Sequence, residues 1–168
     1  MKSLTTKLIL GLLLSLLFTL PSLSQSDKQK GFFMIEQNST INPFTLNDQF
    51  GKEQTISTLP KLLICSFGKE TGKLISSYFN AQDADYLAKN DIKLIADVSS
   101  VPSLLRSTFI LPKMKKYSFE ILISTQSDFS DQFPRKEDEL TVLKLENGVV
   151  ESITFVGNEA GLKESIEG

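Results

Sequence analysis

The chain has 168 residues, of which 18 are basic and 20 acidic, and it contains one cysteine and no histidine. Without histidine, a Ser-His-Asp triad and a His-bearing zinc site are excluded, and one cysteine cannot form an intramolecular disulfide. The net charge of −2 gives no indication of binding to nucleic acid or to an anionic membrane surface.

Residues 1–24 have the order of a secretory signal peptide. A basic start with Lys2 and Lys7 precedes an apolar run over 8–20, and small residues follow up to Ser24. Because the run is short for a membrane span, we predict cleavage near Ser24, a periplasmic or secreted location, and no membrane span after cleavage. An uncleaved N-terminal anchor is the alternative.

Residues 25–40 begin with a polar, charged stretch and are predicted to be a flexible tether, followed by one domain over 41–168. The domain opens with a predicted hairpin. Its two β-favouring triplets, 44–46 and 54–56, are separated by Asn, Asp and Gly residues that favour a turn.

The central part of the domain alternates between strand and helix patterns. The apolar runs 62–67 and 92–98 show no alternation with polar residues, as strands buried on both faces require. Between them, 70–79 has the apolar periodicity of a helix, and Asp83 is predicted to cap a second short helix.

A third helix is predicted to open at 100–102, where a capping Ser precedes a Pro in the first turn. Its inner face is predicted to carry Leu104, Leu105 and Phe109. Pro112 is predicted to end this helix because proline lacks the N–H that a helix interior needs.

The C-terminal part is predicted to contain a third buried strand over 119–123 and then a hairpin and a helix. The β-rich runs 140–145 and 149–156 flank Asn147-Gly148, the strongest short hairpin signal. Asn158 is predicted to cap the last helix.

Strand-helix-strand units imply parallel neighbours, and the closing hairpin adds an antiparallel edge. The predicted fold class is therefore α/β, with a mixed central sheet, helices on both faces and a C-terminal antiparallel hairpin.

Two stretches resemble the thioredoxin-like superfamily, in its exported TlpA and peroxiredoxin-like form. The segment PFTLNDQFGKEQTISTLPKLLICSF is similar to the entry of those domains, and ELTVLKLENGVVESITFVGNEAGLKESI is similar to their closing hairpin and last helix. The order of elements looks most like YtfJ-type periplasmic proteins that lack the redox cysteine pair. The resemblance covers roughly 44–166 and includes no catalytic signature.

The resemblance places the four redox positions on residues 69–72, which read Lys-Glu-Thr-Gly and contain no cysteine. Cys65 lies four residues upstream in an apolar strand, where a thiol is usually a small buried hydrophobe. The family's cis-proline before the third core strand is also missing, since Tyr117-Ser118 occupies that approach. Cys65 is thus a structural residue or, alternatively, a weak candidate for a reactive thiol.

Polar residues follow two predicted parallel strands, at the edge of the sheet where ligands gather in open α/β folds. The ligand-binding candidates are Lys69, Glu70 and Thr71 after the first strand and Asp97 and Ser99 after the second. The helix start with Lys69 would suit an anion. The alternative is an ordinary capped helix with solvated side chains.

A basic stretch follows the third predicted helix and is a candidate docking surface for an acidic partner. Its candidate residues are Arg106, Lys113, Lys115, Lys116 and Tyr117. A solvated charged face is the alternative, and the loop over 129–135 is a second place where a partner could bind.

The sequence therefore predicts an exported thioredoxin-fold protein without a redox-active Cys-x-x-Cys, which binds a periplasmic protein or a small ligand. The alternative is a thiol-active protein, redox or peroxiredoxin-like, that uses Cys65. No cofactor, metal or nucleic acid is predicted, because no phosphate loop or dinucleotide fingerprint is present.

Overall fold

The computed structural model describes residues 34–168, so the predicted signal peptide and residues 25–33 of the predicted tether lie outside the described residues. The elements in chain order are β1 (Phe44–Asp48), β2 (Glu53–Ile56), β3 (Leu62–Ser66), α1 (Lys69–Asn80), α2 (Tyr86–Lys89), β4 (Ile92–Asp97), α3 (Ser103–Leu105), the π-helical turn η1 (Arg106–Ile110), α4 (Leu111–Met114), β5 (Leu122–Ser124), α5 (Ser127–Ser130), β6 (Leu140–Glu146), β7 (Val149–Val156) and α6 (Glu159–Glu167).

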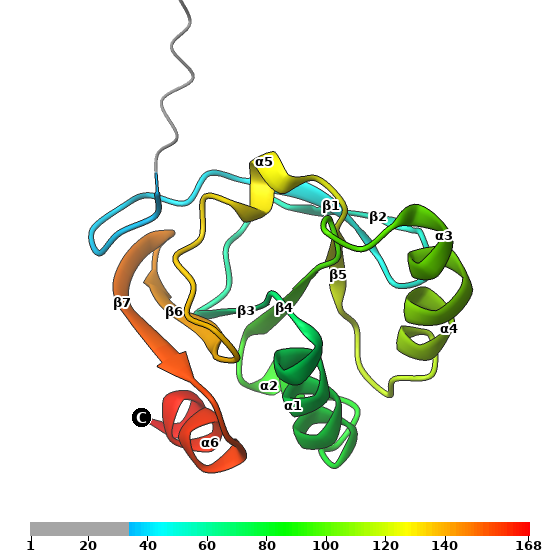
Figure 1. Ribbon diagram of the computed structural model, residues 1–168. Helices are drawn as coiled ribbons and strands as arrows, with labels where there is room; N and C mark the ends of the chain where they lie inside the picture. The colour runs from blue at the N-terminus through cyan, green and yellow to red at the C-terminus, as the bar shows by residue number, and fades with distance from the viewer. Residues whose placement is uncertain (1–33) are drawn as a thin grey trace, which may run out of the picture. The chain divides into compact units, whose positions relative to one another are not determined.

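The strands of this part of the chain form one seven-stranded mixed sheet in the order β2-β1-β5-β4-β3-β6-β7 (Figure 1). The centre of the sheet is parallel, because β3 and β5 both pair in parallel with β4. The β6–β7 hairpin is antiparallel and joins the other side of β3. The predicted α/β fold class is confirmed.

Each face of the sheet carries its own hydrophobic core. On one face, Ile75 and Phe79 of α1, Met114 of α4 and Leu162 of α6 pack against the strands. On the other face, Ile35, Ile41 and Leu59 from the segments before β1 and after β2 pack against the strands, together with residues of α5 and of the loop that follows it. Figure 1 shows α1, α2 and α6 grouped on one side and α5 on the other.

Strand β3 is the most enclosed element. All five of its residues are buried, and its backbone is hydrogen-bonded to β4 on one side and to β6 on the other. The unbroken apolar run that predicted this strand follows from that position, because neither face of β3 meets water.

The predicted turn and cap signals near the C-terminus are confirmed. Asn147 and Gly148 adopt φ angles of 51° and 81°, the left-handed pair that a two-residue type I′ hairpin requires. The Asn158 side chain accepts a hydrogen bond of 2.9 Å from the Gly161 N–H at the start of α6, which satisfies one free donor of the first turn. The cap of α2 was misassigned, since its N-cap is Asp85 and not Asp83.

The third core strand is shorter than predicted, because β5 begins only at Leu122. Its neighbour β1 ends at Asp48, where the chain turns, so residues 119–121 have no β1 backbone beside them. The buried amide of Gln49 takes that place. It donates to the Phe119 carbonyl at 2.8 Å and accepts from the Ile121 N–H at 3.1 Å.

The predicted end of the third helix at Pro112 is wrong. The turn η1 precedes the proline, and the Leu111 N–H bonds the Arg106 carbonyl five residues back. This wider turn makes room for the proline ring, which clashes with the i−4 carbonyl in a regular α-helix. Helix α4 therefore continues to Met114, with Pro112 in its first turn.

The predicted inner face of this helix is also wrong. Leu104, Leu105 and Phe109 are exposed by 75%, 47% and 64%. The extra residue in η1 turns this part of the helix away from the core. Ile110, Leu111 and Met114 provide the buried contacts in their place.

The folded domain includes residues that the sequence analysis assigned to the tether. The backbone of Ile35 bonds Gln132, and the backbones of Asn38 and Ser39 bond Val150. No helix among residues 34–168 has the length and apolar character needed to cross a membrane.

Replacement of Gln49 tests the side-chain bridge to residues 119–121. Gln49→Met keeps the approximate shape but leaves a buried carbonyl and a buried N–H unpaired, so we expect a loss of about 3 kcal/mol in the free energy of unfolding. Urea denaturation measures this loss. Gln132→Met, at an exposed amide, is the matched control with a change within about 0.5 kcal/mol. An equally small loss for Gln49→Met would contradict the bridge.

Candidate functional site

The carboxyl ends of β3 and β4 meet the first turn of α1 and the side of α4. Between them lies a cavity of about 270 Å³, called here the α1–α4 cleft. Its lining is Ser66, Phe67, Gly68, Lys69, Gly72, Ala96, Asp97, Val98, Ser100, Val101, Ile110, Lys113, Met114 and Tyr117. Apolar side chains form most of the wall, and two lysines and one carboxylate reach it.

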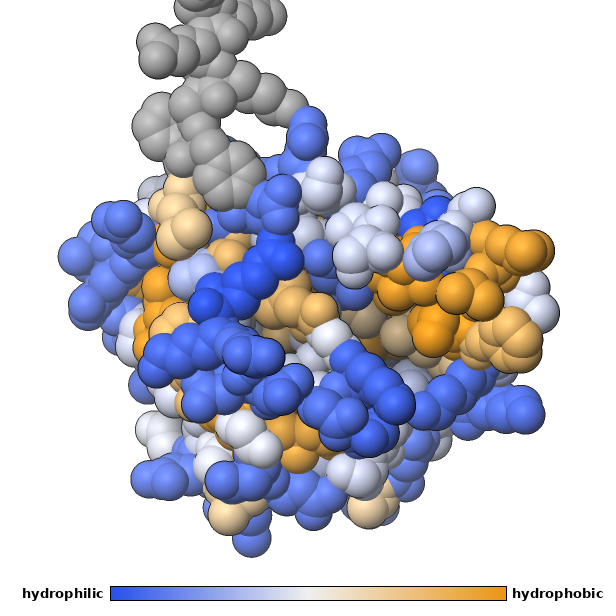
Figure 2. Space-filling model, in the orientation of Figure 1, coloured by the Kyte–Doolittle hydropathy of each residue, from blue (hydrophilic) through white to orange (hydrophobic). Residues whose placement is uncertain are grey.

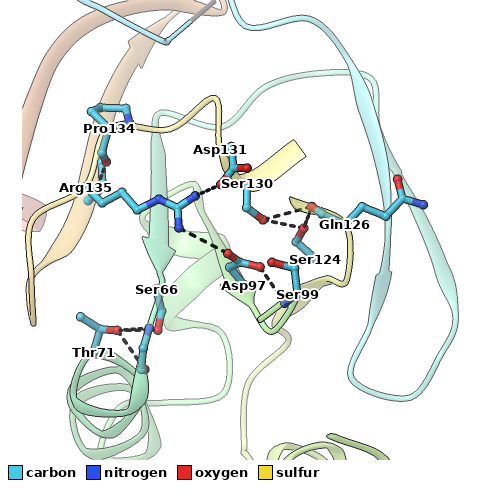
Figure 3. A network of polar contacts seen from close by, with 12 residues as sticks. Ser66, Thr71, Asp97, Ser99, Ser124, Gln126, Ser130, Asp131, Pro134 and Arg135 are labelled. Carbon is cyan, nitrogen blue, oxygen red and sulfur yellow. Dashed lines mark hydrogen bonds and ion pairs between the residues drawn. The ribbon is translucent and has the colours of Figure 1, made fainter. Parts of the chain in front are cut away.

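The polar groups at the start of α1 form hydrogen bonds with one another. The Thr71 hydroxyl accepts from the Gly68 N–H at 3.0 Å, contacts the Gly68 carbonyl at 3.0 Å and lies 2.9 Å from the Ser66 hydroxyl (Figure 3). Thr71 is buried. Its role in the structure is therefore that of a cap for the helix, and it does not line the cleft.

The two charged residues of this turn differ in their surroundings. The Glu70 carboxylate accepts hydrogen bonds of 2.8 and 2.9 Å from Lys73, and this partner lowers the pKa of Glu70. Glu70 is exposed and lies outside the cleft lining. Lys69 lines the cleft, and no acid of residues 34–168 forms an ion pair with it.

Asp97 ends β4 and is held from two sides, as Figure 3 shows. Its Oδ1 accepts from the Ser99 N–H at 2.9 Å, and its Oδ2 lies 3.8 Å from the Arg135 guanidinium. The Asp97 side chain is only 5% exposed. Ser99 acts through its backbone and is not part of the cleft lining.

Arg135 comes from the loop before β6 and joins several parts of the site. Besides Asp97 it pairs with the Asp131 carboxylate, and its guanidinium carbon lies 4.7 Å from the centre of the Phe67 ring. Removing one partner of a buried carboxylate usually leaves an uncompensated charge. Arg135 therefore stabilises Asp97 in a largely dry position and covers the end of β3.

Short hydrogen bonds hold the loop that carries Arg135. The Ser130 hydroxyl donates to the Ser124 hydroxyl at 2.7 Å, and that hydroxyl donates to the Gln126 carbonyl at 3.1 Å (Figure 3). The Thr141 hydroxyl donates to the Pro134 carbonyl at 2.6 Å. The loop is thus anchored to β5 and β6 on either side of Arg135.

Cys65 lies in β3, directly before Ser66. Its side chain is 0% exposed and packs in the core on the β1 side of the sheet. Burial raises the pKa of the Cys65 thiol far above its ordinary value, and the nearby Asp97 carboxylate raises it further. A thiol in this position is a poor nucleophile, because the thiolate is the reactive form.

The residues predicted to form a partner surface do not share one environment. Arg106 turns inward and donates to the Val98 carbonyl at 3.2 Å. Tyr117 is half-buried and stacks on Phe119 with ring centres 4.9 Å apart. Lys115 and Lys116 are exposed, and Lys113 is exposed at the border of the α1–α4 cleft.

A larger hollow of about 680 Å³ lies at the opposite end of the parallel strands. Its lining comes mostly from the loop before β3 and from the β6–β7 turn. Asp91 at its edge already accepts from the Lys61 N–H at 3.0 Å. The α1–α4 cleft is the better candidate site, because it lies at the carboxyl ends of the parallel strands, where ligands bind in open α/β sheets.

Among residues 34–168, no three His, Cys, Asp or Glu side chains gather as ligands for a metal ion. Lys69 and Asp97, which the sequence predicted as ligand-binding residues, both line the cleft. The contact of Arg135 with Asp97 and the apolar walls from Val98 to Tyr117 were not predicted. The only sequence signal for Arg135 was its position in a loop, after the two aromatic residues Phe129 and Phe133.

No family model and no curated protein sequence matches the chain. Solved structures match it over most of its length at low sequence identity. A protein assigned as a disulfide isomerase from Bacteroides thetaiotaomicron has a TM-score of 0.52 and 14% identity, over 80% of this chain and 88% of its own. Peroxidoxin BcpB from Mycobacterium tuberculosis has a TM-score of 0.53 and 14% identity, over 79% of this chain and 95% of its own.

A protein assigned as the thiol:disulfide interchange protein DsbE from Chlorobium tepidum is similar as well, with a TM-score of 0.52 and 14% identity, over 79% of this chain and 94% of its own. The chain therefore has a thioredoxin-like fold. At this level of identity the likeness concerns the fold alone. Its chemistry has to be argued from the residues of this chain.

Proposed function

We propose that this protein is an exported thioredoxin-fold module that binds another protein in the α1–α4 cleft and carries out no thiol chemistry. One observation carries the proposal. The first turn of α1 reads Lys69-Glu70-Thr71-Gly72, and the chain's single cysteine is fully buried in β3. Disulfide exchange needs an exposed thiolate of low pKa and a second thiol to release the mixed disulfide.

The size and lining of the α1–α4 cleft support a peptide as its ligand. A volume of about 270 Å³ is just below the range of about 300–1,000 Å³ for small-molecule sites. It suits one or two large side chains. Apolar walls from Val98, Val101 and Met114 would bury such a side chain, and Lys69 and Lys113 could bind carbonyl or carboxylate groups beside it.

The exported location is supported by the basic start, apolar run and small residues of 1–24. We expect the protein from an extracytoplasmic fraction to begin near Gln25. Intact mass spectrometry of that fraction checks this expectation. A chain that retains Met1 there would contradict cleavage and favour the N-terminal anchor.

The alternative is a thiol-active protein that uses Cys65, as a thioredoxin or a peroxidase would use a cysteine. Its support is the fold shared with peroxidoxin BcpB and with the protein assigned as DsbE. Burial of the Cys65 side chain and its raised pKa weigh against it. The alternative requires that β3 open before Cys65 can react.

Insulin reduction with dithiothreitol and peroxide reduction with the same thiol decide between the two functions. We expect the purified protein to show no turnover above the buffer rate, and Cys65→Ala to behave identically. In parallel, a thiol reagent should modify Cys65 slowly in the folded protein and at the normal rate in denaturant. Turnover by the unaltered protein that is lost in Cys65→Ala would contradict the proposed function and support the thiol-active alternative.

Occupation of the cleft is tested by NMR with two capped amino acids, N-acetyl-phenylalanine amide and N-acetyl-leucine amide. We expect amide shifts at Gly68, Val101 and Met114. Ser100→Trp should remove these shifts, because the indole fills the cleft from its rim. Ser152→Trp, at an exposed position on β7, is the control and should keep them. Shifts elsewhere, or none, would contradict a binding role for the cleft.

A further inference from the structure

Beside the α1–α4 cleft the helical segment exposes three large apolar side chains, Leu104, Leu105 and Phe109, called here the α3 patch. Figure 2 shows apolar side chains gathered where Figure 1 places α3 and α4. Isolated exposed leucines are common, but a group of large apolar side chains on one short helix is a feature of interaction surfaces.

The α3 patch is followed along the chain by basic side chains that form no ion pair with an acid of residues 34–168. Residues 98–119 contain no acid and four basic side chains. Within the described part of the chain no acid forms an ion pair with Lys113, Lys115 or Lys116, whereas the lysines at 73, 89, 93, 136, 144 and 163 are each paired. The three lysines are therefore free to pair with an acidic group from outside.

The apolar and basic groups are separated along the helix axis. The α3 patch occupies the N-terminal half, and the three lysines occupy the C-terminal end. Their centres are about nine residues apart, which is about 13 Å in a helix. A helix that lies on a membrane instead separates its apolar and basic groups around the axis, over its whole length. This arrangement favours a protein chain over a lipid surface.

We propose that the α3 patch and Lys113, Lys115 and Lys116 together bind an acidic segment of a partner protein. The segment would place two or more large apolar side chains on the α3 patch and an acidic run on the lysines. About four residues of extended chain span the distance between the two groups. This inference rests on the proposed binding role and uses a surface separate from the cleft, with Lys113 at the border of both.

The test begins with selection of random 12-residue peptides, displayed on phage, against the full domain. We expect enriched peptides with Leu, Phe or Trp pairs about four residues from a run of Asp and Glu. Binding of one enriched peptide, labelled with fluorescein, is then measured by anisotropy. Leu104→Ser/Phe109→Ser and Lys115→Glu/Lys116→Glu, both outside the cleft lining, should each weaken it about tenfold or more, and added salt should weaken it further.

Two control variants alter similar groups elsewhere. Phe50→Ser changes an aromatic side chain that is 61% exposed in the β1–β2 turn, and Lys52→Glu/Lys61→Glu changes two other lysines that no described acid pairs with. Both should bind the peptide as the unaltered protein does. Ser100→Trp should also retain binding, which separates failure of the cleft proposal from failure of this one.

Three results would overturn the inference. The first is selection of peptides without the acidic and apolar pattern, or of peptides that bind equally well to the patch variants. The second is sedimentation with phosphatidylglycerol vesicles that depends on Leu104 and Phe109, which would assign the surface to lipid. The third is a dimer in sedimentation velocity that Leu104→Ser/Phe109→Ser dissociates, which would assign it to a second copy of the chain.

Discussion

The structure depends on the complete burial of β3. This strand is paired on both edges and covered on both faces, so every residue from Leu62 to Ser66 is removed from water. The register of such a strand is fixed, because a shift by one residue would move each of its side chains to the opposite face of the sheet and into the other core. It consequently fixes where the chain emerges at Phe67 and where α1 can begin. The α1–α4 cleft, the cap at Thr71 and the position of Asp97 beside β3 all follow from that point.

The same burial separates the thiol from the helix start. A helix N-terminus lowers the pKa of a thiol through its dipole and its free N–H groups, but Cys65 lies inside the sheet and gains neither. At the helix start itself, the Thr71 hydroxyl accepts a hydrogen bond from the Gly68 N–H, and the Ser66 hydroxyl contacts that of Thr71. A fold that serves disulfide chemistry elsewhere thus presents here a capped helix and a cleft with apolar walls. Such a surface is suited to recognition.

Much of the fold could be predicted from the sequence because its signals are local. The apolar run of β3, the Asn147-Gly148 turn and the Asn158 cap each depend on residues within one element or turn. The predictions that were wrong depend on contacts between residues distant in sequence or on a local change in helix geometry. Gln49 pairs with residues about 70 positions away, and η1 accommodates Pro112 in a way that helical periodicity cannot indicate. In the candidate site, Lys69 and Asp97 follow strands and could be found, whereas Arg135 reaches Asp97 only through the folding of a loop.

The single π-helical turn makes the shape of the surface sensitive to chain length. One residue corresponds to about 100° of rotation in an α-helix. Deletion of one residue between Arg106 and Ile110 would carry Leu104 and Leu105 about a quarter of the way around the axis, but it would also remove the wide turn that makes room for Pro112. The proline therefore helps to keep this apolar surface turned toward the solvent.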